Sequence, residues 1–264
     1  MPRSLLAVCT FLVLGIEGPV QAGIKTEVVE YRHGDVVLEG YLAYDEDTST
    51  KRPGVLIVHE WFGHNGYARQ RAEQLAASGY VAFALDMYGK GVLAKTNEEA
   101  AQMSNRFRTD RQLMRDRAAA GLAVLQQHAA VAPGKIAAIG YCFGGTVALE
   151  LARGGAHLAG VVSFHGGLNT PRPEDARNIK GRLLILHGAD DPFVPETEVA
   201  AFIKEMRAAQ VDWQMVSYGG AVHSFTNPDA GTNVASGAAY NEKADQRSYL
   251  AMLIFFNELF ADKK

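Results

Sequence analysis

The sequence is poor in cysteine: its 264 residues contain two, Cys9 and Cys142. Two thiols cannot form the disulfide framework of a small secreted domain. A chain of this length does not need one, because it can bury roughly 70–75% of its unfolded surface. The sequence also has little net charge, with 26 Lys+Arg against 29 Asp+Glu and a formal charge of −3. Together with 48% hydrophobic residues, this balance excludes intrinsic disorder and argues against nucleic acid as a partner.

Long apolar runs are also missing, apart from one near the start of the chain. Residues 5–16 are almost wholly apolar, follow Arg3 and precede the small residues Val20 and Ala22. A positive start, an apolar middle and a small-residue exit are typical of a secretory signal peptide, and the run is too short for a membrane span of about 20 residues. We therefore expect residues 1–22 to be removed as a signal peptide. An uncleaved anchor or an amphipathic first helix is the alternative.

Cleavage would leave residues 23–264 as a single domain, exported to the periplasm or secreted, with no stable membrane association. It would also remove Cys9, so that Cys142 has no partner for an internal disulfide. A lone thiol in an oxidising compartment is either buried and inert or chemically used. The residues around Cys142 must decide between these two roles.

The chain contains no repeat, low-complexity tract or Pro/Ser-rich linker, and its apolar segments alternate between strand and helix patterns. Residues 26–31 and 36–44 alternate in polarity around Gly34 and predict a hairpin. Further strands are predicted at residues 55–59, 80–85, 135–140, 158–164, 183–187 and 212–217, and helices at residues 68–78, 98–128, 144–153, 196–209 and 242–260. This order predicts an α/β fold with a mostly parallel sheet, helices on both faces and an antiparallel N-terminal hairpin.

Sites in such open sheets form beyond the carboxyl ends of the strands, and residues 140–145 directly follow one of them. Their sequence Gly-Tyr-Cys-Phe-Gly-Gly fits the G-x-C-x-G pattern of a sharp strand-to-helix turn, which would expose Cys142 above the sheet. The helix N-terminus favours the thiolate, and the Phe143 N–H would face the oxyanion formed when the thiol attacks a carbonyl. The alternative is a tight turn that contains a small residue.

Two further residues follow strands at the same edge of the predicted sheet. Asp191 comes after one strand, and His223 comes after the next strand along the chain. The order nucleophile, acid, histidine is that of α/β-hydrolase triads, so Asp191 can orient His223, which can deprotonate Cys142. Asp190 could compete for the acid role. Asp191 could instead be a helix N-cap or turn former, and His223 a surface-loop histidine.

The loop His-Glu-Trp-Phe-Gly after another buried strand contains Glu60 and Trp61. The Trp61 N–H is the expected second oxyanion donor, and Glu60 would place a carboxylate in the cleft, unless it is a solvated loop acid. His59, His165 and His187 also end strands, and we interpret them as packing or loop-supporting side chains. No two His, Cys or Asp residues on one element have the spacing of metal ligands, so neither a metal nor another cofactor is predicted.

These segments resemble the dienelactone hydrolase family, and the resemblance covers about residues 23–260. Its most specific parts are the loop with Glu60, the turn around Cys142, Asp191 ahead of Phe-Val-Pro, and His223 followed by Ser-Phe. It implies an α/β-hydrolase fold and a carboxymethylenebutenolidase-like hydrolase of esters or lactones. By the same resemblance Cys142 is the nucleophile, His223 the base and Asp191 its orienter. Glu60 would hold or activate the thiol in a substrate-dependent way.

The sequence departs from that family where the substrate is held. The well-studied dienelactone enzymes bind the substrate carboxylate with two arginines, and the corresponding positions here are Lys90 and Asn227. Lys90 could still attract an anion, but the bidentate fork of an arginine is lost. The catalytic machinery therefore carries over, whereas a dienelactone substrate does not follow.

We predict a cysteine-dependent hydrolase of carboxylic esters or lactones that works through a thioester on Cys142. Its partner is a small-molecule substrate, and the expected assembly is a monomer or a small homo-oligomer. The alternative is an exported thiol-reactive, redox-sensing or ligand-binding protein that uses the same fold without ester turnover.

Overall fold

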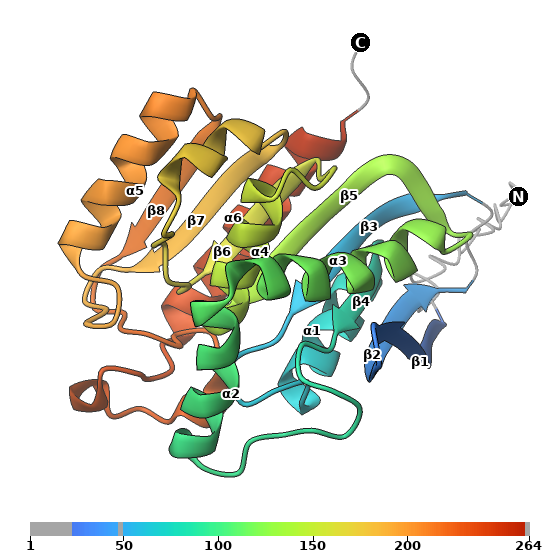
Figure 1. The fold of residues 1–264 in the computed structure, drawn as a ribbon, viewed down its shortest axis with the longest axis horizontal. Helices are drawn as coiled ribbons and strands as arrows, with labels where there is room; N and C mark the ends of the chain where they lie inside the picture. The colour runs from blue at the N-terminus through green and yellow to red at the C-terminus, as the bar shows by residue number, and fades with distance from the viewer. Residues whose placement is uncertain (1–22, 47–49, 262–264) are drawn as a thin grey trace, which may run out of the picture.

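The computed structural model describes residues 23–46 and 50–261, which form an eight-stranded sheet with helices on both faces (Figure 1). The predicted signal segment, residues 1–22, lies outside the described residues. The strands are β1 (Ile24–His33), β2 (Val36–Asp45), β3 (Arg52–Val58), β4 (Val81–Leu85), β5 (Val131–Tyr141), β6 (Gly160–Phe164), β7 (Arg182–Gly188) and β8 (Trp213–Tyr218). The helices are α1 (Gly66–Ala77), α2 (Asn97–Thr109), α3 (Arg111–Gln127), α4 (Phe143–Arg153), α5 (Glu196–Ala209) and α6 (Glu242–Phe260), with short 3₁₀ turns η1 (Pro173–Asn178), η2 (Pro228–Ala230) and η3 (Val234–Ser236).

The sheet is antiparallel at its N-terminal edge and parallel elsewhere, in the order β1-β2-β4-β3-β5-β6-β7-β8. The hairpin closes where His33 pairs with Val36, and Gly34 has a φ of 58°, which a residue without a side chain adopts at little cost. Strand β2 then pairs antiparallel with β4, and all remaining pairs are parallel. The predicted α/β class and the antiparallel hairpin are confirmed.

Two hydrophobic layers enclose the sheet. On one face, α2, α3, α4 and α5 bury residues such as Phe107, Met114 and Phe202 against the strands, and α3 and α4 cross in front of the sheet in Figure 1. On the other face, α1 and α6 bury residues such as Leu75 and Phe256. Since both faces of the strands are covered, their apolar runs are continuous, and the carboxyl-end loops are left free to carry polar chemistry.

The single helix predicted over residues 98–128 is wrong in one respect, because Asp110 divides it into α2 and α3. The backbone of Asp110 has φ −121° and ψ 88°, outside the helical region, and its carboxylate accepts a hydrogen bond from the Leu113 N–H at 2.9 Å. A short acceptor that caps the first turn of a new helix competes with continuation of the old one.

Strand β5 begins at Val131, earlier than the predicted start at residue 135, and therefore includes Pro133 and Gly134. Its pairing with β3 shifts between Arg52, opposite Val131, and Gly54, opposite Ile136. Proline cannot donate to a ladder, so this irregularity lets the pair lie inside the strand. In the described part of the chain, no helix is both long enough and apolar enough to span a membrane.

Candidate active site

Cys142 lies on a sharp turn between β5 and the first residue of α4. Its backbone has φ 53° and ψ −117°, a left-handed conformation that is rare for a residue with a side chain. The flanking glycines allow this turn, because a Cβ on Gly140 would collide with the Gly144 carbonyl, and one on Gly144 with the Val58 carbonyl. Cys142 is a buried residue that keeps 7% of its surface exposed.

The histidine and one of the two candidate acids meet in the adjacent loops. His223 Nδ1 lies 2.8 Å from Asp191 Oδ2, and the other oxygen of Asp191 accepts a hydrogen bond from the Phe193 N–H at 2.8 Å. Asp190 is exposed and accepts from the Gly220 N–H at 3.0 Å instead. The structure therefore pairs His223 with Asp191, and the carboxylate fixes which ring nitrogen carries its proton.

The thiol interacts with the same histidine ring from the other side. Burial disfavours the charged imidazolium, but the negative charge of Cys142 and hydrogen bonds with Asp191 and Cys142 outweigh it and raise the pKa of His223 to about 10. A histidine with this pKa stays protonated at neutral pH. Asp191, His223 and Cys142 thus lie in a row, with the His223 ring in contact with the acid on one side and the thiol on the other.

The backbone N–H groups of Phe143 and Trp61 are the predicted donors of an oxyanion hole. Phe143 is the first residue of α4, where the N–H groups have no partner within the helix. The loop that carries the Trp61 N–H is fixed by a hydrogen bond from the Tyr88 hydroxyl to the Trp61 carbonyl at 2.9 Å. Within residues 23–46 and 50–261, neither the Phe143 nor the Trp61 N–H has a backbone or side-chain acceptor, so both remain available to a ligand.

His59 supports this loop, in the role that its position at the end of β3 predicts. The Met87 N–H donates to His59 Nε2 at 3.1 Å, so Nδ1 carries the proton and donates to the Glu60 carbonyl at 2.5 Å. Burial lowers the pKa of His59 and keeps the ring neutral. Both nitrogens are thus used to hold the backbone of the loop, and none is left for chemistry.

Glu60 is buried and turned toward the loop that follows His223. Its carboxylate accepts from Asn227 Nδ2 at 2.5 Å and from the Ser224 hydroxyl at 3.4 Å. Burial raises the pKa of Glu60, although the Asn227 hydrogen bond and the charge of His223 act in the opposite direction. Asn227, predicted to bind substrate, is therefore occupied with Glu60, and in the described residues Glu60 has no hydrogen bond to Cys142.

Lys90, the other predicted substrate contact, is not brought to the triad. Its ammonium pairs with the Glu30 carboxylate at 2.7 Å, and both side chains are 52% exposed. Glu30 belongs to β1, four strands away from β5 in the sheet order. The hydrogen bond from the Lys90 N–H to the Val37 carbonyl holds this segment against β2, beside β1, and the role of Lys90 in attracting a substrate anion stays a prediction.

Residues 38–260 match the dienelactone hydrolase family. The chain belongs to the dienelactone hydrolase family. Among solved structures of similar proteins, m3DLH is 42% identical with a TM-score of 0.87, and the match covers 90% of this chain and 99% of that one. A dienelactone hydrolase-like promiscuous phosphotriesterase, P91, from metagenomic libraries is 40% identical with a TM-score of 0.85 over 90% of this chain and 99% of that one. A protein of Bradyrhizobium sp. named "Probable 2-oxo-3-(5-oxofuran-2-ylidene)propanoate lactonase" is 30% identical over 72% of this chain and 80% of its own.

Membership of the dienelactone hydrolase family makes the chain a hydrolase with the α/β-hydrolase fold. The predicted family and enzyme class are confirmed. The described residues contain no group of three or more His, Cys, Asp or Glu side chains that could hold a metal ion.

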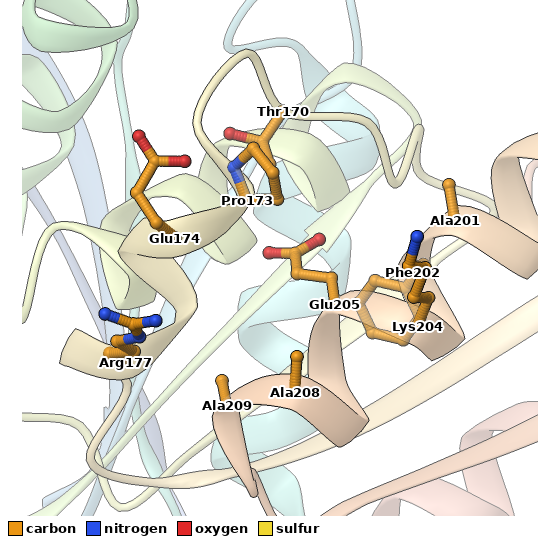
Figure 2. Close-up of a pocket in the computed structure, with 10 residues that line it drawn as sticks. All are labelled: Thr170, Pro173, Glu174, Arg177, Ala201, Phe202, Lys204, Glu205, Ala208 and Ala209. Carbon is orange, nitrogen blue, oxygen red and sulfur yellow. The ribbon is translucent and has the colours of Figure 1, made fainter.

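A cavity of about 420 Å³ lies apart from the triad, between η1 and α5 (Figure 2). None of its lining residues belongs to the predicted site. Glu205 lines it, and both oxygens of that carboxylate accept from the buried Arg153 at 2.8 Å. A second hollow, of about 460 Å³, is bordered by Tyr67 and Asn227 and lies next to the partner of Glu60.

Sequence reasoning missed a buried polar chain beneath the triad. The His165 ring, interpreted as a packing or loop-supporting side chain, makes two hydrogen bonds, to the Cys142 N–H and to the Thr226 hydroxyl. Thr226 continues to the Tyr67 hydroxyl, and Arg71 donates to both the Tyr67 hydroxyl and the Thr226 carbonyl. The available signal was the position of Thr226 three residues after His223, which places it in the catalytic loop.

Proposed function

We propose that this chain is a cysteine-dependent hydrolase of carboxylic esters or lactones. The observation that carries the proposal is the row formed by Asp191, His223 and Cys142 at the carboxyl edge of the sheet. A thiolate beside an imidazolium is the activated state of a cysteine nucleophile, and an acid behind the ring fixes its orientation. Family membership supports the hydrolytic chemistry.

In the proposed reaction, the Cys142 sulfur attacks the ester carbonyl and forms a carbon–sulfur bond. The carbonyl electrons move onto oxygen, where the N–H groups of Phe143 and Trp61 would stabilise the negative charge. The imidazolium of His223 gives its proton to the departing alkoxide as the carbon–oxygen bond breaks, leaving a thioester. Neutral His223 then takes a proton from water, the hydroxide attacks the thioester, and the thiolate leaves as the acid forms.

Export is part of the same proposal. The signal-like segment at residues 1–22 supports it, and the lone Cys142 of the remaining chain would then work in an oxidising compartment. Burial of Cys142, which is 7% exposed, would slow oxidation of its thiol.

Mass spectrometry of the protein mixed with p-nitrophenyl acetate tests this function. We expect a rapid release of p-nitrophenol, steady turnover afterwards, and one acetyl group on the Cys142 peptide when the reaction is quenched early. A burst and a labelled Cys142 followed by turnover support the hydrolase. Oxidation of the thiol without ester turnover would instead identify a redox-sensing protein.

The substrate is expected to be uncharged near its carbonyl. Lys90 is paired with Glu30, and Asn227 is bonded to Glu60, so neither offers the fork that binds a carboxylate. For two aryl esters of equal size, we expect the neutral one to have a kcat/KM at least about tenfold above that of the carboxylate-bearing one, because a carboxylate that leaves water without a cationic partner pays a desolvation cost, and about 1.4 kcal/mol is a factor of ten. A preference for the acidic ester in steady-state kinetics would contradict this assignment.

A further inference from the structure

The His165 ring links the nucleophile to the loop of the catalytic histidine. The Cys142 N–H donates to His165 Nδ1 at 3.1 Å and shares this hydrogen with the Phe164 carbonyl at 3.0 Å. On the other side of the ring, His165 Nε2 lies 2.8 Å from the Thr226 hydroxyl. Because an amide can only donate, Nδ1 must be the acceptor and Nε2 must carry the proton that is donated to Thr226.

The environment of His165 keeps this tautomer neutral. The residue is 1% exposed, and burial together with the positive charge of His223 lowers its pKa well below the usual range. The rings of His165 and His223 meet edge to face, with centroids 5.3 Å apart. A protonated His165 would therefore place an N–H against the Cys142 amide hydrogen and a positive charge beside the His223 imidazolium, and both contacts are repulsive. Since its only lone pair is already engaged by that amide, the ring cannot serve as a second base.

The backbone of His165 is also held in an uncommon conformation. Its φ is 40°, while Cys142 has 53° and Ser224 has 55°, and in the described part of the chain the only other non-glycine residue with a positive φ is Gln210, at a helix end. Left-handed residues persist where surrounding contacts determine them and cluster at functional sites. Three of them here are the nucleophile, the residue that accepts its amide hydrogen and the residue after His223.

Thr226 extends the link into the body of the protein. Its hydroxyl lies 2.7 Å from the Tyr67 hydroxyl, and Arg71 donates to the Thr226 carbonyl at 2.8 Å and to Asp245 at 2.6 Å. Helices α1 and α6 thus fix Thr226, which lies three residues after His223. The fixed hydroxyl then sets the position of the His165 ring.

We propose that His165 is a positioning residue that keeps the Cys142 turn and the His223 loop in register. This inference rests on the proposed hydrolytic function, because it assigns His165 a task in aligning sulfur and imidazole. Two hydrogen bonds, one with the Cys142 N–H and one with the Thr226 hydroxyl, would hold the sulfur and the His223 ring at contact distance. Small misalignment of reacting groups costs as much as about 10²-fold in rate.

Two conservative substitutions separate the two hydrogen bonds. His165→Asn places an amide oxygen near the position of Nδ1, so it can accept from Cys142, and asparagine tolerates the left-handed backbone. His165→Gln places its terminal amide near Nε2, so it can reach Thr226 but leaves the Cys142 amide with the Phe164 carbonyl alone. His165→Leu removes both bonds at similar volume. We expect kcat to fall less than about fivefold in the Asn variant and roughly 10²-fold in the Leu variant, with the Gln variant between them and KM nearly unchanged in all three.

A second measurement reports on alignment rather than on folding. The rate at which iodoacetamide alkylates Cys142, measured as a function of pH, should be similar in the wild type and the Asn variant, because both keep the sulfur beside the charged ring of His223. In the Leu variant that rate should fall toward the His223→Ala value, while the melting temperature stays above the assay temperature. Exposed His157, whose Nε2 lies 3.0 Å from the Lys180 ammonium, serves as the control, and His157→Asn should leave the alkylation profile unchanged.

The outcomes divide cleanly. A folded Leu variant with wild-type kcat and a wild-type alkylation profile overturns the positioning role. If the Leu variant does not fold, the kcat values of the Asn and Gln variants decide. An equal loss of kcat in both variants, or a larger loss in the Asn variant, also overturns the positioning role. Absence of ester turnover in the wild type would refute the proposed function, and the alkylation profiles of the variants would still show whether His165 aligns Cys142 with His223.

Discussion

Replacing Cys142 with alanine should lower the turnover of p-nitrophenyl acetate by about 10⁴-fold or more, because removal of a nucleophile leaves only the binding and oxyanion contributions. The fold should remain, since alanine differs from cysteine only by the sulfur and can occupy the same left-handed turn. Steady-state kinetics measure the loss, and circular dichroism with thermal melting checks the fold. Unchanged turnover in a folded variant would remove Cys142 from the mechanism.

Cys142→Ser is the matched control for this experiment. It keeps a nucleophilic atom above the sheet but replaces a readily ionised thiol with a hydroxyl, which needs a base to deprotonate it during attack. We expect activity above that of the alanine variant and well below that of the wild type. Equal activity of the serine variant and the wild type would show that thiolate character contributes nothing.

Replacing His223 with alanine should lower kcat by a factor on the order of 10³ or more, because both proton transfers pass through this ring. The Asp191 carboxylate would lose its 2.8 Å partner, and Cys142 would lose the positive charge beside it. Exposed His157, whose Nε2 lies 3.0 Å from the Lys180 ammonium, offers a control: His157→Ala should keep its activity. A loss below tenfold on removal of His223 would show that another base serves.

The pH dependence of this pair has a definite sign. The pKa of His223 is about 10 in the folded protein, above the value of about 6.5 for an unperturbed histidine. The folded state therefore binds a proton that the unfolded state has released, and the resulting stabilisation is lost as pH rises through about 10. The difference in melting temperature between the wild type and His223→Ala should shrink as the pH is raised from 8 toward 11.

The triad residues were predictable because each stands directly after a strand that the sequence shows as a local apolar run. Cys142, Asp191 and His223 needed only strand ends and chain order, which short segments encode. Glu60 was placed in the correct loop for the same reason. The pairing of Glu60 with Asn227 spans 167 positions, and its geometry depends on the side-chain directions of two separate loops, which apolar patterning does not specify.

Lys90 and His165 both have partners that are distant in the sequence and that local patterns do not specify. For Lys90 the sequence indicated a chemistry, but the backbone bond to Val37 turns the segment toward β1 and Glu30. For His165 the sequence suggested packing or support of a loop without naming a partner, and the hydrogen bonds to Cys142 and Thr226 arise across 23 and 61 positions. Asp110 differs, because the residue that separates α2 from α3 is a local signal. An acid that caps a helix looks the same in the sequence as the charged residues of i,i+4 pairs within one long helix.

The positive φ at Cys142 costs folding stability, whereas the proposed activity needs the side chain that makes this φ unfavourable. A glycine there would relax the turn, since it has no β-carbon to crowd the carbonyls around it, but it would also delete the sulfur. A single codon change would therefore give a more stable but inactive variant. Purifying selection for turnover is what keeps such variants from replacing the active protein.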